Sequence, residues 1–424
     1  MSSHIKKVIS PPPPLLVAFE NPALQNRCFA IALLLGLLWI ALGTGDWFMR
    51  FHKFGWERSF IVRGAAESAV RDESRVVTNA PYSGGDLSRL IGIRAVAARH
   101  EEDRPAATNF FDAYGFRNLP PLLDDYPVVV VGDSYAATGP RMEDTFPAQL
   151  SEAIGQPVYN HAVEGRGTFW AIVRFFAAER FRGKEPRVVV WPVIEREVAG
   201  AYFEGGLYQI SQTEPSAGAK ASSAARMDWS QLQPATLRRS LPNTSAFSQI
   251  ANRIWNRVRY AVFHQVNPAV VPSSSPASGG PMLFYSEAVR FQKWTDSERD
   301  LRHLVHAVTN IAAIARSRGM ELVFVLIPDK ERIYADALPA LVRAGMPPDV
   351  LPEVERQFRA AGLHVVNLLP VFESAARRGE LLFWRDDTHW NPAGVRLAAQ
   401  TVAPEVRRLS RDPEAHLQNV HGKP

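Results

Sequence analysis

The chain has 424 residues, of which 46% are hydrophobic and 21% are charged, values typical of a globular protein with a substantial core. Its formal charge of +5 comes from 48 Lys and Arg against 43 Asp and Glu. With no basic stretch that also carries spaced aromatics, this small excess does not indicate a nucleic-acid-binding surface. The single cysteine, Cys28, excludes an intrachain disulfide framework and a cysteine-rich metal site.

The first predicted element is an apolar helix near the N-terminus. Residues 1–26 include four consecutive prolines and are predicted to form a disordered cytoplasmic tail. From Cys28 to Gly43 the chain reads CFAIALLLGLLWIALG, so residues 27–48 are long and apolar enough to span a bilayer. An uncleaved anchor is favoured over a cleaved signal peptide or a buried core helix, because the preceding tail is long for a signal peptide. Basic residues flank the helix on both sides, so the distribution of charge does not decide its orientation. The chemistry described below favours an extracytoplasmic location for the remaining chain.

After a predicted stalk and lead-in over residues 49–105, apolar runs alternate with helical patterns. The apolar runs predict five strands buried on both faces of a parallel sheet: 127–131, 158–160, 187–193, 321–327 and 364–368. Helices are predicted at 145–154, 170–181 and 297–318, and a last one opens at Asn391 with Pro392 at its first position. The expected fold class is α/β, with a doubly wound, mostly parallel five-stranded sheet.

The predicted α/β domain covers residues 106–410, followed by a disordered tail at 411–424. Within it, residues 198–295 do not follow the strand–helix alternation and are predicted to be an insertion. They include Ser/Ala-rich and Pro/Ser-rich stretches around a predicted helix at 247–263. We expect this insertion to be a lid or a binding subdomain.

A serine follows directly on the first predicted strand, in the run Gly132-Asp133-Ser134-Tyr135. Ligands of open parallel sheets bind outside the carboxyl ends of the strands, so Ser134 is expected at the mouth of that crevice. The alternative is that Asp133 and Ser134 only cap the next helix. This motif alone does not decide between the two.

A histidine preceded by two carboxylates lies near the C-terminus, in the run Asp386-Asp387-Thr388-His389-Trp390. A serine hydroxyl is a weak nucleophile that needs a base within hydrogen-bond reach, and the base needs a carboxylate that fixes its tautomer. His389 would be the base, with Asp387 or Asp386 as its acid partner. A surface histidine beside a helix N-cap is the alternative, but the two motifs together favour a Ser-His-Asp acyl-enzyme mechanism.

These motifs resemble those of a known superfamily. Gly132-Asp133-Ser134 looks like the first sequence block of the SGNH (GDSL-like) hydrolases, and residues 387–391 look like the last block. Residues 160–165 are similar to the second block, whose glycine amide helps form the oxyanion hole. The Asp-Thr-His-Trp run resembles, more narrowly, the SGNH-like domains of the alginate O-acetyltransferase family. Residues 115–118 and 328–334 also fit that family.

The resemblance implies roles for individual residues. Ser134 would be the nucleophile, His389 the base and the Gly165 amide an oxyanion donor, with Asn160 beside it in the second block. Asp387 matches the Asp-Thr-His-Trp pattern, whereas Asp386 matches the spacing of common SGNH hydrolases; Asp387 is favoured.

The sequence also departs from the family pattern. Tyr135 replaces the leucine of lipase-like members; it and Asn160 are candidates for the oxyanion or substrate-binding site. The third block, Gly-x-Asn-Asp, is missing after the third strand, and Arg196 is the candidate that replaces its asparagine near the oxyanion or substrate. A structural ion pair of Arg196 with Glu195 is the alternative. The serine block precedes the histidine block, whereas the alginate proteins have the reverse order.

By this resemblance the chain is expected to be an O-acetyltransferase of a secreted or cell-surface polysaccharide. It would be anchored in the inner membrane by one helix, with its catalytic domain in the periplasm. A membrane-bound O-acyltransferase partner would supply the acetyl groups. The alternatives are a carbohydrate acetylesterase and a non-catalytic polysaccharide-binding subunit. No cofactor or metal is expected, since His303 and His306 have no acidic partner at ligand spacing.

Overall fold

A computed structural model describes residues 22–48, 75–80, 85–91, 107–163, 168–198, 246–263, 265–276, 280–290 and 297–411. The chain divides into two compact units. One comprises residues 1–64 with 244–250, and the other comprises residues 65–243 with 251–424. The predicted disordered tails lie outside the described residues, except for residues 22–26 and 411.

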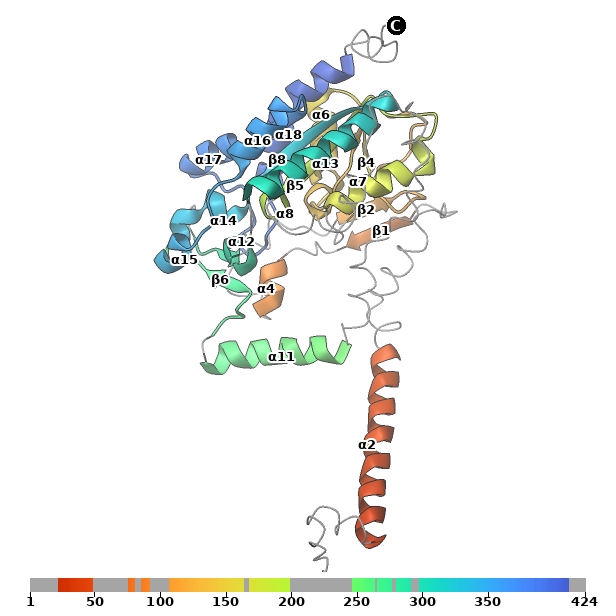
Figure 1. Cartoon of the computed structure of the whole chain (residues 1–424), viewed down its shortest axis with the longest axis vertical. Coiled ribbons are helices and arrows are strands. Elements are labelled where there is room, and N and C mark those ends of the chain that lie inside the picture. Colours follow the sequence, from red (N-terminus) through yellow and green to blue (C-terminus); the bar gives the residue numbers. More distant parts are fainter. Residues whose placement is uncertain are drawn as a thin grey trace, which may run out of the picture. The chain divides into compact units, whose positions relative to one another are not determined.

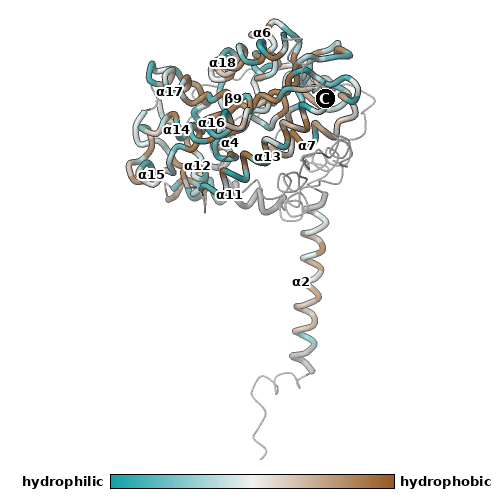
Figure 2. Tube along the Cα trace, turned by 45° about the horizontal axis from the view of Figure 1, so that its top comes forward, coloured by the Kyte–Doolittle hydropathy of each residue, from teal (hydrophilic) through white to brown (hydrophobic). Residues whose placement is uncertain are grey.

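In the first unit the described N-terminal element is helix α2 (Pro22–Phe48). Its stretch Asn26–Gly45 is apolar and has no buried residue, and Figure 2 colours most of its length white to brown. At 1.5 Å per residue these 20 residues extend about 30 Å, the thickness of a bilayer's hydrocarbon core. The helix therefore has the length and composition of a membrane span or a signal sequence.

The second unit is built on a five-stranded sheet in which every neighbouring pair is parallel, in the order β4-β3-β5-β8-β9. This confirms the predicted fold class, and the observed strands lie within a residue or two of the predicted runs. Their bounds are β3 (Val128–Val130), β4 (Val158–Asn160), β5 (Val188–Ile194), β8 (Glu321–Ile327) and β9 (His364–Asn367). Numbered along the chain, the order is 2-1-3-4-5, so the chain reverses its direction of winding at β3. Crevices form at such switch points.

Helices cover both faces of the sheet (Figure 1). Alternate residues of β3 point to opposite faces, so Val129 joins one core and Val128 and Val130 join the other. The first core is closed by α7 (Thr168–Ala177), α13 (Ser297–Ser317) and α16 (Leu351–Ala360). The second is closed by α6 (Phe146–Ile154), α17 (Leu369–Arg377) and α18 (Pro392–Arg411). Burial on both faces explains why the strands appear as continuous apolar runs.

Apart from α11 (Ala246–Phe263), which agrees with the helix predicted at 247–263, the further described elements were not predicted. Two antiparallel pairs lie outside the main sheet: β1 (Arg75–Ala80) with β2 (Ala107–Phe111), and β6 (Val270–Pro272) with β7 (Leu283–Tyr285). The remaining helices are α4 (Asp86–Ile91), α5 (Ser134–Ala137), α8 (Glu195–Val198), α11 (Ala246–Phe263), α12 (Ser286–Arg290), α14 (Lys330–Ile333) and α15 (Ala340–Ala344). Within the described residues, 3₁₀ turns lie at Met142–Asp144, Glu179–Phe181 and Ala335–Ala337. The stretch predicted as a stalk and lead-in therefore holds a strand and a helix, β1 and α4.

Candidate active site

The turn after β3 presents Ser134 at the end of the sheet. Asp133 is the N-cap of α5, and its carboxylate accepts the backbone N–H of Tyr135 at 2.9 Å. Capping is thus performed by Asp133, and the hydroxyl of Ser134 is left for other contacts. Gly132 permits the sharp turn, because a Cβ there would lie 2.9 Å from Cβ of Ala136 and 3.3 Å from Cγ of Pro192.

Ser134, His389 and Asp387 form one chain of hydrogen bonds. Nε2 of His389 lies 2.8 Å from Oγ of Ser134, and its Nδ1 lies 2.6 Å from Oδ1 of Asp387. The same carboxylate oxygen accepts the backbone N–H of His389 at 3.0 Å. With the Nδ1 proton directed to Asp387, Nε2 is free to accept the serine proton. The imidazole is 15% exposed and the Asp387 side chain 1%.

Electrostatics within this chain of hydrogen bonds favour the charged pair. Burial opposes the imidazolium, but the Asp387 carboxylate outweighs it, so the pKa of His389 is raised above its usual value. Burial by itself would raise the pKa of Asp387. The charge and N–H donors of His389, with the Gly85 N–H, hold that pKa well below its usual range. Asp387 is therefore ionised throughout the range in which His389 titrates.

The neighbouring carboxylate has a different partner. Oδ2 of Asp386 accepts the hydroxyl of Ser88 at 2.7 Å, and the backbone N–H of Ser88 donates to the Asp386 carbonyl at 3.2 Å. Asp386 thus binds α4, while Asp387 contacts the imidazole. Of the two predicted acids, the geometry brings Asp387 to His389.

Helix α4 supplies contacts that the sequence did not indicate. Its preceding residue Gly85 donates a short N–H hydrogen bond to Oδ2 of Asp387, and the Asp86 N–H donates to the same oxygen at 3.3 Å. The Asp86 carboxylate accepts the N–H and the hydroxyl of Thr388 at 2.8 and 2.6 Å. It also lies 4.0 Å from Nδ1 of His389. Burial and the charge of Asp387 raise the pKa of Asp86. Gly85 and Asp86, about 300 residues before Asp387 in the sequence, thus complete the surroundings of its carboxylate.

A buried lysine holds the histidine-bearing loop from the other side. Nζ of Lys330 lies within hydrogen-bond reach of the carbonyls of Leu283, Trp384, Arg385 and Asp387, at 2.6, 2.7, 3.1 and 3.0 Å. The side chain has no exposed surface, and burial lowers its pKa to about 8. Lys330 ties this loop to β7 and fixes the backbone of the triad acid.

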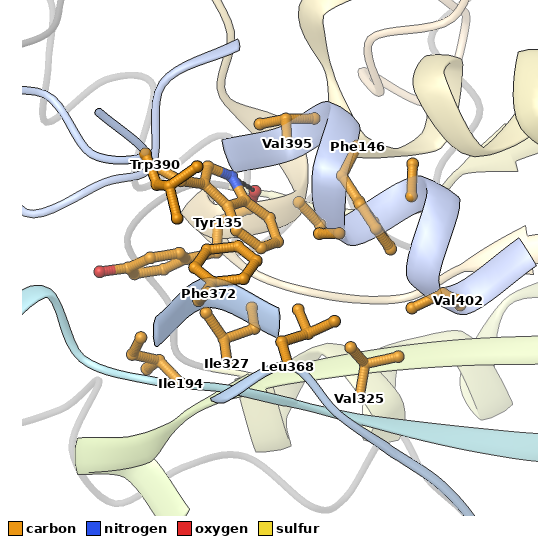
Figure 3. Close-up of a cluster of buried hydrophobic side chains, with 14 of the residues drawn as sticks. Tyr135, Phe146, Ile194, Val325, Ile327, Leu368, Phe372, Trp390, Val395 and Val402 are labelled. Carbon is orange, nitrogen blue, oxygen red and sulfur yellow. Dashed lines mark hydrogen bonds between the residues drawn. The ribbon is translucent and has the colours of Figure 1, made fainter. Parts of the chain in front are cut away.

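Tyr135, a predicted oxyanion or substrate contact, is buried against the loop that carries His389. It is 1% exposed, its hydroxyl donates to the Thr388 carbonyl at 2.7 Å, and its ring lies 4.7 Å from the ring of His389. The indole N–H of Trp390 donates to the Tyr135 carbonyl at 2.8 Å, the dashed line in Figure 3. Both ends of Tyr135 are therefore bound to the loop that carries His389.

Arg196 reaches the site through Tyr135. Its guanidinium forms a short ion pair with Asp329 and donates to the Tyr135 hydroxyl at 3.2 Å. Glu195, the alternative ion-pair partner predicted for Arg196, instead accepts the Nε–H of Arg332 at 3.0 Å. Arg196, which follows β5, thus connects Asp329, which follows β8, with Tyr135 of the nucleophile turn.

The second block contacts the motif that precedes β3. Oδ1 of Asn160 accepts the Ala162 N–H at 2.9 Å, and its Nδ2 donates to the Arg117 carbonyl at 3.1 Å. The side chain of Asn118 in turn binds the backbone N–H and carbonyl of Asn160, at 2.9 and 3.1 Å. The Asn160 side chain thereby shapes this turn. Gly165, the predicted oxyanion donor, lies outside the described residues.

The only group of His, Cys, Asp and Glu side chains in the described part of the chain that could hold a metal ion is Asp86, Asp387 and His389. Oδ1 of Asp387 and Nδ1 of His389 already face each other at 2.6 Å. A cation that bridged these atoms would have to separate them. The observed arrangement is a hydrogen-bonded relay of Ser134, His389 and Asp387, with the geometry that a catalytic triad requires.

Comparisons with known proteins bear on this site. Residues 65–195 and 282–423 match the family model of the SGNH hydrolase-like domain of the acetyltransferase AlgX. The chain is 25% identical over 223 residues to the probable alginate O-acetylase AlgJ of Pseudomonas putida, covering 51% of this chain and 53% of that one. It is 28% identical over 172 residues to the AlgJ of Pseudomonas aeruginosa, covering 41% and 40%. The matched regions thus span about half or less of these relatives.

Proposed function

Since the chain belongs to the SGNH hydrolase-like family of the acetyltransferase AlgX, we propose that it is an O-acetyltransferase of a secreted or cell-surface polysaccharide. The observation that carries the proposal is the hydrogen-bonded relay from Ser134 through His389 to Asp387. It lies at the carboxyl end of β3, beside the switch point of the sheet. The relatives named as alginate O-acetylases support a polysaccharide acceptor.

In the proposed first half-reaction, His389 takes the proton of Ser134 as the serine oxygen attacks the carbonyl carbon of an acetyl ester. The tetrahedral intermediate collapses, the bond to the donor oxygen breaks, and His389 returns the proton to the departing alcohol. The product is an acetyl ester on Ser134. Asp387 holds the imidazole tautomer and stabilises the imidazolium at each proton transfer.

In the second half-reaction a sugar hydroxyl gives its proton to His389 and attacks the acetyl-serine carbonyl. The Ser134–acetyl bond breaks, and the serine regains its proton from His389. The backbone amides of Ser134 and Gly165 are the proposed oxyanion donors. Because Arg196 is engaged with Asp329 and Tyr135, its proposed role is to orient the nucleophile turn and the loop of His389.

The proposal also places the protein at a membrane. Helix α2 would be the single-pass anchor in the inner membrane, with the second unit in the periplasm. Because acetyl groups must reach that compartment in activated form, the proposed donor is a membrane-bound O-acyltransferase partner. Water is the competing acceptor, and its use would make the protein an acetylesterase.

The experiment supplies the full-length chain with an acetyl ester donor and an oligosaccharide acceptor, and follows acetylation of the acceptor by mass spectrometry. Acetylated product from the wild type but not from Ser134→Ala would support the proposal. Release of acetate at a rate that the acceptor leaves unchanged, with no acetylated sugar, would make the protein an esterase. An inert wild type would contradict both.

A further inference from the structure

Helix α11 presents an apolar face to solvent. Ile254, Val258 and Val262 are spaced four residues apart and so lie on one side of the helix, next to Trp255. These side chains are 57%, 39%, 63% and 55% exposed, and Phe263 at the end of the helix is 56% exposed. An amphipathic helix of a soluble domain normally turns such a face to the core. A contiguous exposed patch of this kind marks an interaction site.

The domain holds α11 by a different face. Tyr260 packs against a small core made of Leu87, Val270 and Leu283. Just beyond the helix, Gln265 donates its N–H to the Arg259 carbonyl at 3.3 Å. Tyr260 lies six residues from Ile254, which is about 240° around the helix at 100° per residue. The apolar stripe therefore points away from the surface on which the helix rests.

The charge of α11 is of one sign. Between Ala246 and Phe263 the sequence holds Arg253, Arg257 and Arg259 and no acidic residue. By helical geometry Arg257 and Arg259 fall on the two borders of the apolar stripe. Arginines in that position can keep the guanidinium in water while their stems lie along an apolar phase. Tryptophan also favours the boundary between water and lipid.

We propose that α11 lies in the membrane–water interface, with the stripe of Ile254, Trp255, Val258 and Val262 inserted into anionic lipid. Basic borders, an apolar stripe with a tryptophan and the absence of acidic residues are the features of an interfacial helix. A second copy of the chain fits this surface less well, because the arginines of two such helices would face one another. The small core under α11 includes Leu87 of α4, the helix whose first residues bind Asp387. The lipid contact would thus orient the catalytic site relative to the membrane surface.

The test places a single fluorescent label on the stripe of the full-length chain. Cys28 is the only cysteine, so a Cys28→Ser background accepts Val258→Cys, modified with an environment-sensitive dye. The matched control is Arg356→Cys on α16, at a side chain that is 65% exposed. Both proteins are reconstituted in phosphatidylcholine vesicles with or without phosphatidylglycerol, and nitroxide-labelled lipids serve as quenchers.

We expect the label at position 258 to shift to shorter wavelength and to be quenched by lipid nitroxides in the anionic vesicles, while the control label stays water-like. In the same background, Arg257→Gln and Arg259→Gln should each lower the ratio of inserted to exposed label by about fivefold. A water-like label at position 258 in anionic vesicles would overturn the proposal. So would equal insertion with and without phosphatidylglycerol, or a shift that requires added membrane protein.

The labelled variants also need an independent check of folding, which the melting temperature provides. The readout is spectral and does not use the acetyl transfer reaction. An inert enzyme with an inserted label would therefore contradict the proposed function and leave the membrane contact standing.

Discussion

Two adjacent carboxylates, Asp386 and Asp387, serve different structures in the same turn. One accepts the hydroxyl of Ser88, and the other accepts both N–H groups of His389. Sequence spacing did not decide which of the two is the triad acid. The directions in which two adjacent side chains point are set by the backbone conformation of the loop. That backbone is fixed by Lys330 and by α4, which are remote in sequence.

Replacing each carboxylate by its amide separates the two roles. Asp387→Asn should lower kcat by about 10⁴-fold, since the amide no longer fixes the productive imidazole tautomer. Asp386→Asn keeps the triad and should lower stability by about 1–3 kcal/mol through its weakened bond to Ser88. Steady-state kinetics and thermal unfolding of both variants measure these effects. Equal losses of kcat in both variants would contradict the assignment.

The pH dependence of activity follows from the raised pKa of His389. The imidazole must be neutral to accept the serine proton, so kcat/KM falls as the pH drops through its pKa. Because Asp387 raises that pKa, the acid limb of the profile should lie above the ordinary histidine value of about 6.5. This pKa is measured from a profile of kcat/KM against pH, with an ester substrate whose signal does not depend on the buffer. An acid limb below pH 6 would show that the carboxylate does not stabilise the imidazolium.

Among the elements, α4 makes the largest contribution to the site that could not be predicted from the sequence. The five sheet strands were predictable, because strands buried on both faces are continuous apolar runs. Helix α4 has only six residues, too few to show a repeating helical pattern of apolar residues. Its partners Asp386, Asp387 and Thr388 lie about 300 residues away. Local sequence carries no signal for such a contact. Strands β1, β2, β6 and β7 were also missed, since they lie outside the main sheet and its alternation of strands and helices.

Removing the Asp86 side chain tests whether α4 positions the triad. Asp86→Ala loses both bonds to Thr388 and the negative charge near His389. We expect kcat to fall on the order of tenfold to a hundredfold, and the acid limb of kcat/KM to move to lower pH. Asp336→Ala is the matched control, since that aspartate is fully exposed in an ion pair with Arg343. A reduced kcat with an unmoved acid limb would mean that Asp86 is only structural.

For the whole molecule, the fold brings together the side chains of Ser134 and His389, which lie 255 residues apart in the sequence. Ser134 follows the first strand of the sheet and His389 precedes its last helix, yet their side chains meet at 2.8 Å beside the switch point. The position of the serine was predictable from its place after a buried strand. The way in which Tyr135 and Arg196 support the site was not, since it depends on packing between β5, β8 and the loop of His389.

The proposed anchor predicts how the intact protein fractionates. The full-length chain should sediment with membranes and resist alkaline carbonate extraction, because α2 would span the bilayer. Deleting residues 1–48 should remove this resistance, and any remaining association through α11 should be released by salt. Fractionation followed by immunoblotting measures both. Full release of the intact chain by carbonate would contradict the anchor.

The most direct test of the central claim is turnover of a chromogenic acetyl ester by the wild type, Ser134→Ala and His389→Ala. We expect that the wild type turns over and that each variant loses on the order of a thousandfold or more in kcat. We also expect an acetyl group on Ser134 in protein quenched during turnover. Turnover that survives in either variant, or a wild type indistinguishable from both, would contradict the serine mechanism.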